Sequence, residues 1–274
     1  MSILEECAEL PERVRTLRPL VHHLTNYVTV NDCANVTLAI GASPIMATAI
    51  EEVGEIAAMS SAVVLNIGTL HSDVVVSMLA AGKAANAAGV PVVLDPVGAG
   101  ASALRSATTE RLLGEVKVTV IRGNISEIRA ASGLPAHTKG VDADSGDQNA
   151  DAGRIAADLA AKMDCTVVVT GAVDAVSDGR STIFIGNGHP MLSSISGTGC
   201  MCTSLAGAFV GAAPKRPLAA AAAAILAMGI AGEIAYAKAG SLGLGSYRQA
   251  VMDAVSLMTG QTIFAMGNIR ETGH

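Results

Sequence analysis

The chain has 274 residues, half of them hydrophobic, with three tyrosines, three phenylalanines and no tryptophan. Its formal charge of −6 excludes a broad basic surface for nucleic acid or for an anionic membrane, so any anionic ligand must be held locally. The length fits one large α/β domain over residues 1–274, with a core of small aliphatic side chains.

The five cysteines show neither a CxxC pair nor metal-ligand spacing, and the N-terminal segment Met1–Cys7 is acidic where a secretory leader would be basic. We therefore expect reduced thiols and a cytoplasmic location. The most membrane-like run, Leu218–Gly232, is closed by Glu233. It is too short to cross a bilayer of ~30 Å, which predicts a buried helix instead.

The N-terminal third alternates helical and extended patterns. Apolar residues at helical spacing predict a surface helix over 2–16, and a short strand over 19–26 breaks at Thr25 and Asn26. A helix over 31–40, an extended piece over 41–46 and a helix through 51–56 follow.

Continuous apolar runs then predict strands that are covered on both faces. They span residues 62–68, 90–95, 116–122 and 165–170, separated by helical sequence such as 72–88. This alternation predicts an α/β fold with a mainly parallel central sheet flanked by helices on both faces.

The rest of the chain is predicted to form a loop, a hairpin at the edge of the sheet and a helical C-terminal part. The polar stretch 136–153 predicts a surface loop, and residues 172–185 predict an antiparallel hairpin on the edge of the sheet. Helices are expected over roughly 199–210, 217–239 and 247–260.

Each predicted parallel strand ends in polar residues or glycine. They are Asn66 with Gly68, Asp95, Arg122 with Asn124, and Thr170. Ligands of open parallel sheets bind outside the carboxyl ends of the strands, so these residues are predicted to share one rim.

The segment Gly197-Thr198-Gly199 predicts an anion site. Glycines permit positive φ and let successive amides point at one spot, and a helix that starts there adds the positive end of its dipole. Cys200 falls in the first turn of that helix. A glycine turn that merely packs a buried helix is the alternative interpretation.

Two carboxylates on the rim, Asp95 and Glu127, fit a hydrated Mg²⁺, and Arg122 fits a phosphate clamp. Singly, an aspartate before proline is a common turn former, and the other two are common in surface ion pairs. Their joint placement around the glycine segment favours phosphoryl transfer.

Two other enzyme classes remain open on the residues alone. Gly98-Ala99-Gly100 after a strand suggests a nicotinamide-dinucleotide oxidoreductase, although Asp95-Pro96 intervene and the next strand ends in Arg122. Cys200 at a helix start suggests a hydrolase nucleophile, but only His189 lies near it in sequence. A non-catalytic small-molecule binder is a further alternative, which the two carboxylates oppose.

Four segments together resemble the motifs of hydroxyethylthiazole kinase, in the order of that family. They are His23–Val28, Leu94–Ala99, Arg122–Glu127 and Ser196–Cys200. The resemblance implies a ribokinase-like fold and ATP-dependent phosphorylation of 4-methyl-5-(2-hydroxyethyl)thiazole in thiamine salvage. It also implies a homotrimer with active sites between subunits; a related pyrimidine or pyridoxal kinase is the alternative.

The resemblance also implies a role for individual residues. Asp95 and Glu127 are expected to organise Mg²⁺, and Cys200 is expected beside the substrate hydroxyl, where the wider group carries an aspartate base. A thiol of pKa ~8.5 is mostly protonated at neutral pH, so it is a weak base unless the helix terminus lowers that pKa. The thiazole contacts are expected at Asn26, Val28, Met46, Gly68, Gly197 and Cys200, and the ATP contacts at Arg122, Asn124, Thr170, Thr198 and Gly199, with Arg122 also catalytic.

Overall fold

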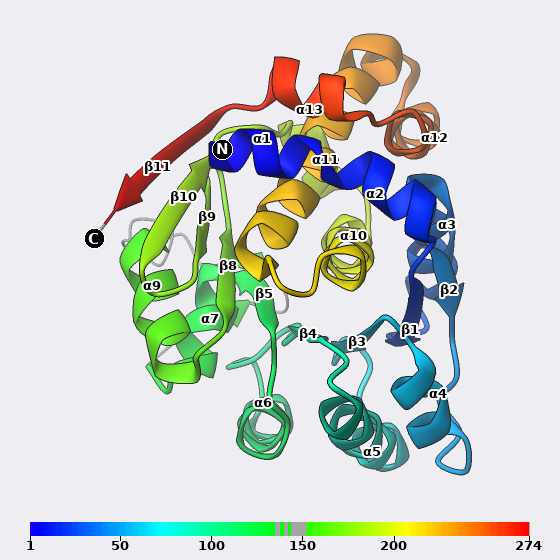
Figure 1. Ribbon diagram of the computed structural model, residues 1–274, viewed down its shortest axis with the longest axis vertical. Helices are drawn as coiled ribbons and strands as arrows, with labels where there is room; N and C mark the ends of the chain where they lie inside the picture. The colour runs from blue at the N-terminus through cyan, green and yellow to red at the C-terminus, as the bar shows by residue number, and fades with distance from the viewer. Residues whose placement is uncertain (135–137, 140–141, 144–151, 274) are drawn as a thin grey trace.

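The computed structural model describes residues 1–134, 138–139, 142–143 and 152–273 (Figure 1). One nine-stranded sheet runs through it in the order β11-β10-β9-β8-β5-β4-β3-β1-β2, and helices cover both faces. The predicted α/β class with a mainly parallel central sheet is confirmed.

Six strands form the parallel part of the sheet: β1 (Leu20–Leu24), β2 (Ser43–Ile45), β3 (Ala62–Asn66), β4 (Val92–Asp95), β5 (Val120–Asn124) and β8 (Thr166–Thr170). Those in the middle are runs of valine, leucine and isoleucine because both of their faces are buried. The strand predicted from residue 116 begins only at Val120. Val116 instead closes α6, since its amide donates to the Leu112 carbonyl.

Three antiparallel strands complete the other side of the sheet: β9 (Asp174–Ser177), β10 (Ser181–Ile185) and β11 (Ile269–Gly273). The predicted hairpin is confirmed as β9 and β10. Its predicted place at the sheet edge is wrong, because β11 returns from the C-terminal helices and pairs with β10 as the outer strand.

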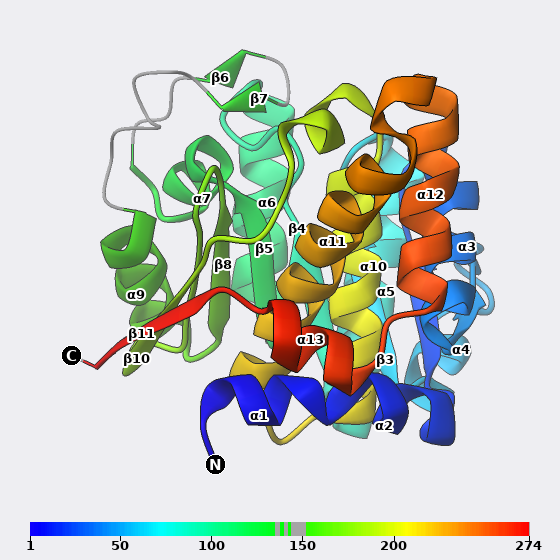
Figure 2. The same ribbon diagram turned by 90° about the horizontal axis from the view of Figure 1, so that it is seen from above.

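Seven helices lie on the face that carries the functional rim: α1 (Ile3–Ala8), α2 (Leu10–Leu17), α3 (Val30–Ile40), α10 (Thr198–Ala212), α11 (Pro217–Ala239), α12 (Leu244–Ser256) and α13 (Gly260–Met266). Figure 2 shows α1 and α2 lying across one end of α10 and α11. The single helix predicted over 2–16 is two helices that meet at Glu9, since Pro11 lacks the amide hydrogen that would continue one helix. The helix predicted to end at Gly260 ends at Ser256, and α13 begins at Gly260.

The opposite face is covered by α4 (Val53–Met59), α5 (Ser72–Ala88), α6 (Ala103–Glu115), α7 (Ile125–Ala131) and α9 (Ala152–Met163). Short 3-10 helices η1 (Pro190–Ser194) and η2 (Gly240–Leu242) flank α10 and α11 in the chain. Most of the loop predicted over 136–153 lies outside the described residues. Within it, β6 (Thr138–Lys139) and β7 (Asp142–Ala143) pair antiparallel.

The apolar run predicted as a buried helix is confirmed within α11. With η2 it forms a helical stretch, Pro217–Leu242, that is long and apolar enough to cross a membrane, but 83% of its most apolar window is buried inside the molecule. Helix α11 therefore belongs to the core between the sheet and α12, as Figure 2 shows.

Helix α10 lies close against the middle of the sheet because a glycine faces the strands. A Cβ on Gly207 would lie 2.6 Å from Val64 Cγ2 and 3.0 Å from Val21 Cγ1, which is closer than side-chain contacts allow. This close packing sets the position of the N-terminus of α10 at the rim.

We expect Gly207→Ala to lower the free energy of unfolding by about 1–3 kcal/mol, because the added methyl overpacks the contact with β3 and β1. Gly114→Ala, in α6 with open space around it, is the matched control and should be neutral or stabilising by about 0.4–1 kcal/mol. Urea unfolding of both variants checks this. Equal effects in the two variants would show that the α10 contact has room to spare.

Candidate functional site

Four of the predicted rim residues project from the same face of the sheet. Side chains alternate along a strand, and the valines two positions before Asn66, Asp95, Arg122 and Thr170 all pack in the core beneath α10. Asn66 and Asp95 are also register partners on β3 and β4. The rim residues therefore meet at the N-terminal end of α10.

The glycine segment starts α10 as predicted. Gly197 has φ 91° and is the N-cap residue, and α10 begins at Thr198. A Cβ on Gly197 would lie 2.7 Å from Thr29 Cγ2, so the chain passes close to the segment before α3. The free amides of this first turn and the helix dipole favour an anion.

The side-chain amide of Asn66 is the centre of a buried hydrogen-bond network. Its Oδ1 accepts from Asn26 Nδ2 at 2.9 Å and from the Gly68 amide at 3.0 Å. Its Nδ2 donates to Asp95 Oδ2 at 2.7 Å and to Cys200 Sγ at 3.3 Å. Four separate segments of the chain are thus joined at one side chain.

The Cys200 thiol accepts from two amides, because Asn26 Nδ2 also donates to Sγ at 3.3 Å. Burial and, to a smaller extent, the charge of nearby Asp95 raise the pKa of Cys200 to about 11. The thiol is therefore protonated at neutral pH. The N-terminal end of α10 does not overcome burial.

Asp95 is a buried carboxylate whose two oxygens differ in their hydrogen bonding. Oδ2 accepts from Asn66 Nδ2 and from Thr203 Oγ1, both at 2.7 Å, whereas Oδ1 is buried and has no partner among the described residues. Burial raises the pKa of this carboxyl, and Arg122, Thr203 and Asn66 act in the opposite direction. A buried acceptor without a partner is costly to the fold and indicates a place for a ligand.

Glu127 is buried and bound at both oxygens by backbone amides. Oε1 accepts from Gly98 and Oε2 from Asn124, each at 2.8 Å, and Asn124 Oδ1 accepts in turn from the Glu127 amide as the cap of α7. Burial, followed by the charge of Asp95, raises the pKa of Glu127 to about 7. The two carboxylates are thus close enough to influence each other's charge.

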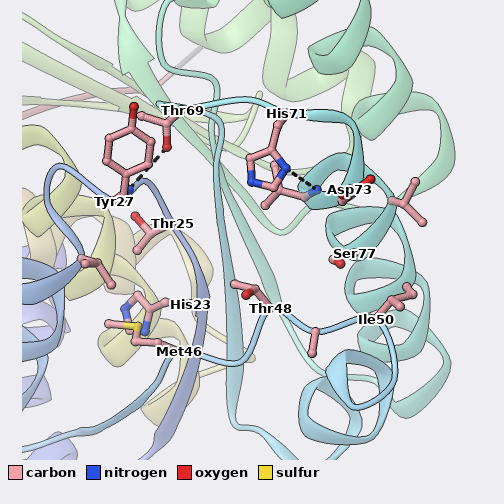
Figure 3. A pocket seen from close by; sticks show the side chains of 14 residues that line it. His23, Thr25, Tyr27, Met46, Thr48, Ile50, Thr69, His71, Asp73 and Ser77 are labelled. Carbon is pink, nitrogen blue, oxygen red and sulfur yellow. Dashed lines mark hydrogen bonds between the residues drawn. The ribbon is translucent and has the colours of Figure 1, made fainter.

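A cavity of about 660 Å³, here called the Met46 cavity, opens beside the Asn26 segment (Figure 3). Figure 3 shows Tyr27, Thr25, His23 and Met46 on one wall and His71 and Ser77 on the wall opposite. The rings of His22 and His23 are buried and hydrogen-bond to the Ala47 and Val21 carbonyls.

A second cavity of about 680 Å³, here called the Arg122 cavity, is lined by the first turn of α10 and by the end of β8. The half-buried Arg122 donates from Nη2 to Thr170 Oγ1 at 3.3 Å, and its buried Nε has no partner among the described residues. A Cβ on Gly199 would lie 2.8 Å from Arg122 Nη1, so only glycine lets the guanidinium lie against α10. Apolar side chains from η1 and α11 form the far wall.

Cys200 lies between the two cavities. Its neighbour Gly199 lines the Arg122 cavity, while Thr25 and Tyr27, the neighbours of its partner Asn26, line the Met46 cavity. The thiol is therefore close in the chain, or through one hydrogen bond, to residues that line each cavity.

The structure brings most of the predicted residues together, and it divides them between the hydrogen-bond network and the two cavities. Asn26, Asp95, Glu127, Gly197 and Cys200 surround the network, Gly68 packs on Asn26, and Arg122, Thr170, Thr198 and Gly199 line one cavity. Met46 lines the other cavity, and Val28 is 60% exposed beside it. Asn124 acts as a helix cap.

Two residues of the network were missed or left without a role. Thr203 lies three positions after Cys200, on the same side of α10, and helical spacing alone indicates that placement. Its position at the end of a strand places Asn66 on the rim, but nothing in the sequence indicates that its amide nitrogen donates to Asp95 and Cys200.

Comparisons of this chain with a family model and with known proteins point to the same family. A model described as the hydroxyethylthiazole kinase family matches residues 12–261. The hydroxyethylthiazole kinase of Ruminiclostridium cellulolyticum is 54% identical over 255 residues, 93% of each chain, and that of Clostridium beijerinckii is 53% identical over 265 residues, 96% of each chain.

Solved structures agree with this family. A hydroxyethylthiazole kinase protein from Pyrococcus horikoshii has a TM-score of 0.88 at 41% identity and covers 97% of this chain and 98% of its own. A pyridoxal kinase from Staphylococcus aureus in complex with ADP has a TM-score of 0.59 at 15% identity, covering 78% and 86%. A ribokinase-like superfamily protein from Enterococcus faecalis has a TM-score of 0.61 at 14% identity, covering 95% and 96%. The last two show the ribokinase-like fold.

The raised pKa of Glu127 predicts how pH changes the effect of Glu127→Gln on stability. Between pH 4.5 and 7 the folded wild type binds more protons at this site than the unfolded chain, so rising pH favours unfolding. Relative to the variant, we expect the wild type to lose roughly 2–4 kcal/mol of unfolding free energy across this range. Urea unfolding of the metal-free proteins at pH 4.5, 6 and 7.5 measures it.

The difference between the two proteins is the informative quantity. Burial lowers the pKa of His23 to about 4, which makes both proteins more stable as pH rises and masks the slope of Glu127 in either curve alone. Glutamine leaves one backbone amide without an acceptor at every pH. It therefore lowers the unfolding free energy by the same amount at each pH and does not change how that free energy varies with pH. A pH-independent difference would place the Glu127 pKa in its ordinary range.

Proposed function

The chain belongs to the hydroxyethylthiazole kinase family, and we infer that it catalyses that reaction at the network around Cys200. The enzyme is a phosphotransferase that moves the γ-phosphoryl group of ATP to the hydroxyl of 4-methyl-5-(2-hydroxyethyl)thiazole, giving the thiazole phosphate of thiamine salvage. The observation that supports this site most is the thiol that lies between two cavities.

The Met46 cavity is the proposed site of the thiazole alcohol. Met46 supplies an apolar contact, and Thr25, Tyr27 and Thr69 line the cavity next to Asn26 and Gly68 in the chain. Asn26, Gly68 and Gly197 are proposed to contact the alcohol from that side. The hydroxyl then lies beside Cys200. Val28, exposed at the cavity mouth, is proposed to contact the ring or the partner subunit.

The Arg122 cavity is the proposed ATP site. The amides of Thr198 and Gly199 and the Arg122 guanidinium would hold the phosphates, with Thr170 fixing the guanidinium. Ile225 and Met228 give the far wall the apolar surface that a purine base needs. Asn124 is proposed to act on ATP only indirectly, through Glu127 and α7.

The residues fit a hydrated Mg²⁺ held mainly by Asp95. Its Oδ1 is a buried oxygen that has no partner in the part of the chain that the structure describes, and Mg²⁺ is typically held by one or two carboxylates, waters and phosphate oxygens. Glu127, bound at both oxygens, would add charge and accept from metal-bound water. When bound, the ion neutralises charge on the phosphates.

Cys200 is proposed to orient the acceptor hydroxyl and to be a poor base. A thiol with a pKa of about 11 carries its proton at neutral pH, and both amide donors already point at its sulfur. Phosphoryl transfer through a loose transition state depends chiefly on positioning and charge neutralisation, which Arg122 and the first turn of α10 supply.

The alternative enzyme classes find less support in the geometry. In the Gly98 turn, the amide donates to Glu127 and Arg105 Nη1 donates to the Val97 carbonyl, so protein groups occupy the place of a dinucleotide phosphate. The Cys200 sulfur accepts hydrogen bonds from two asparagine amides, and no histidine of the described residues hydrogen-bonds to it.

We propose a homotrimer in which a second subunit completes the Met46 cavity. Tyr27, Val28, Ile50 and Val76 expose between 48% and 77% of their surface around its mouth, which is unusual for large apolar side chains unless a partner covers them. Five free thiols support a cytoplasmic location. Sedimentation of a monomer that keeps full activity would contradict the trimer.

Substrate selectivity tests the proposed function directly. We expect ADP release to depend on the thiazole alcohol, with kcat/KM at least about tenfold higher than for hydroxymethylpyrimidine or pyridoxal, because the apolar wall at Met46 suits the thiazole ring. A coupled ADP assay with each alcohol measures it. A preference for pyridoxal or hydroxymethylpyrimidine would assign the chain a neighbouring activity.

The ranking of three variants tests the role of the thiol. General-base help is typically worth 10²–10⁴-fold, and a protonated thiol should contribute less than this. Cys200→Ala should keep measurable turnover, Arg122→Ala should lose more, and Cys200→Asp should stay active. Measurement of kcat at saturating ATP decides; complete loss in a folded Cys200→Ala variant would make the thiol indispensable.

A further inference from the structure

The Asn66 side chain hydrogen-bonds to both groups expected near the reacting atoms, Asp95 and Cys200. The orientation of its amide is fixed by its neighbours. Two N–H donors, from Asn26 and Gly68, point at one end, which must therefore be the oxygen. The nitrogen end then faces Asp95 and Cys200, and its two hydrogens match the two acceptors.

This orientation decides which oxygen of Asp95 is free. Asn66 and Thr203 both donate to Oδ2, so the carboxylate is held in one rotation, with Oδ1 left without a partner among the described residues. Without the Asn66 donor, only Thr203 on α10 would hold Oδ2. The carboxylate plane could then turn about its bond to Cβ.

The same amide also connects the position of Asp95 to that of the thiol. Its contacts to Asp95 Oδ2 and Cys200 Sγ start from a single nitrogen, so the two acceptors cannot move apart independently. Its oxygen ties both to the Asn26 and Gly68 segments beside the Met46 cavity. A shift of about 1 Å in such a site can reduce turnover by ~10²-fold.

We propose that Asn66 is a positioning residue for phosphoryl transfer, which selects Asp95 Oδ1 as the oxygen for the magnesium and phosphate assembly and holds the Cys200 sulfur against the acceptor hydroxyl. The proposal rests on the proposed function. It assigns Asn66 no bond to substrate and no proton transfer.

Asn66→Asp tests the proposal because it keeps the shape and the acceptor oxygen but replaces the amide nitrogen with a carboxyl oxygen. At this distance from Asp95 Oδ2 the new oxygen either repels Asp95 or shares one proton with it, and in both cases it cannot also donate to the Cys200 sulfur. We expect kcat to fall by ~10²-fold or more, with KM for both substrates changed less than about threefold. The kcat is calculated per folded protein, from circular dichroism and thermal unfolding. A purely structural role would lower the folded fraction and leave kcat per folded molecule unchanged, which would overturn the proposal.

Thr203 supplies the matched control, because it donates to the same Asp95 oxygen but does not hydrogen-bond to the thiol sulfur. Thr203→Val should lower kcat by less than Asn66→Asp, and Thr203→Ser, which keeps the hydroxyl, should restore it. If Asn66→Asp does not fold, Asn66→Ser removes the same donor without adding charge and takes its place in both measurements.

The rate at which Cys200 is alkylated tests the contact between Asn66 and the thiol independently of catalysis. Cys200 is the one cysteine of five that is not buried, so iodoacetamide labels it selectively. An N–H donor stabilises the thiolate, so Asn66→Asp should slow labelling at pH 8.5 by about tenfold, whereas Thr203→Val should leave the rate unchanged. Equal labelling rates in wild type and Asn66→Asp would overturn the proposal.

The two measurements separate this proposal from the proposed function. If the wild type does not phosphorylate the thiazole alcohol, the proposed function fails, and the labelling rates still decide whether the Asn66 amide holds the thiol. If the wild type is an active kinase and Asn66→Asp retains its kcat, only the positioning role fails.

Discussion

The candidate site depends on one buried carboxylate, Asp95. It lies at the end of a central strand, 1% exposed, and among the described residues only its Oδ2 accepts hydrogen bonds. A buried charge is stable only when donors and opposite charge surround it, and here Asn66, Thr203 and Arg122 do so. The register of β3 and β4 and the close packing of α10 are what bring these groups to it.

The charge of Asp95 also determines the properties of its neighbours. Burial raises the pKa of both Glu127 and Cys200, and the charge of Asp95 acts in the same direction, so these groups hold protons at higher pH than they would in water. Arg122 faces two carboxylates, Asp95 and Glu127, so negative charge exceeds positive charge among these three groups when both carboxylates are ionised. A divalent cation would remove this excess. The geometry thus favours catalysis by positioning and charge neutralisation over proton abstraction.

The sequence was sufficient to predict the strands, the shared rim and the helix start at Gly197, because each depends on local patterns. Continuous valine runs require burial on both faces, and glycine supplies the positive φ that the turn needs. The sequence could not predict the partners of Asn66, since these depend on strand register and on the distance of α10 from the sheet. It also missed β11, whose pairing with β10 connects segments far apart in the chain.

The central claim is that the charge of Asp95 serves phosphoryl transfer and not the fold. Asp95→Asn keeps the shape and an acceptor for Asn66 and Thr203 but removes the charge, and its kcat and unfolding free energy should be measured together. We predict a fall in kcat on the order of 10²–10³-fold, with the unfolding free energy unchanged or raised, because a buried charge has been removed. A variant that keeps its turnover across magnesium concentrations, or that unfolds, would contradict the account.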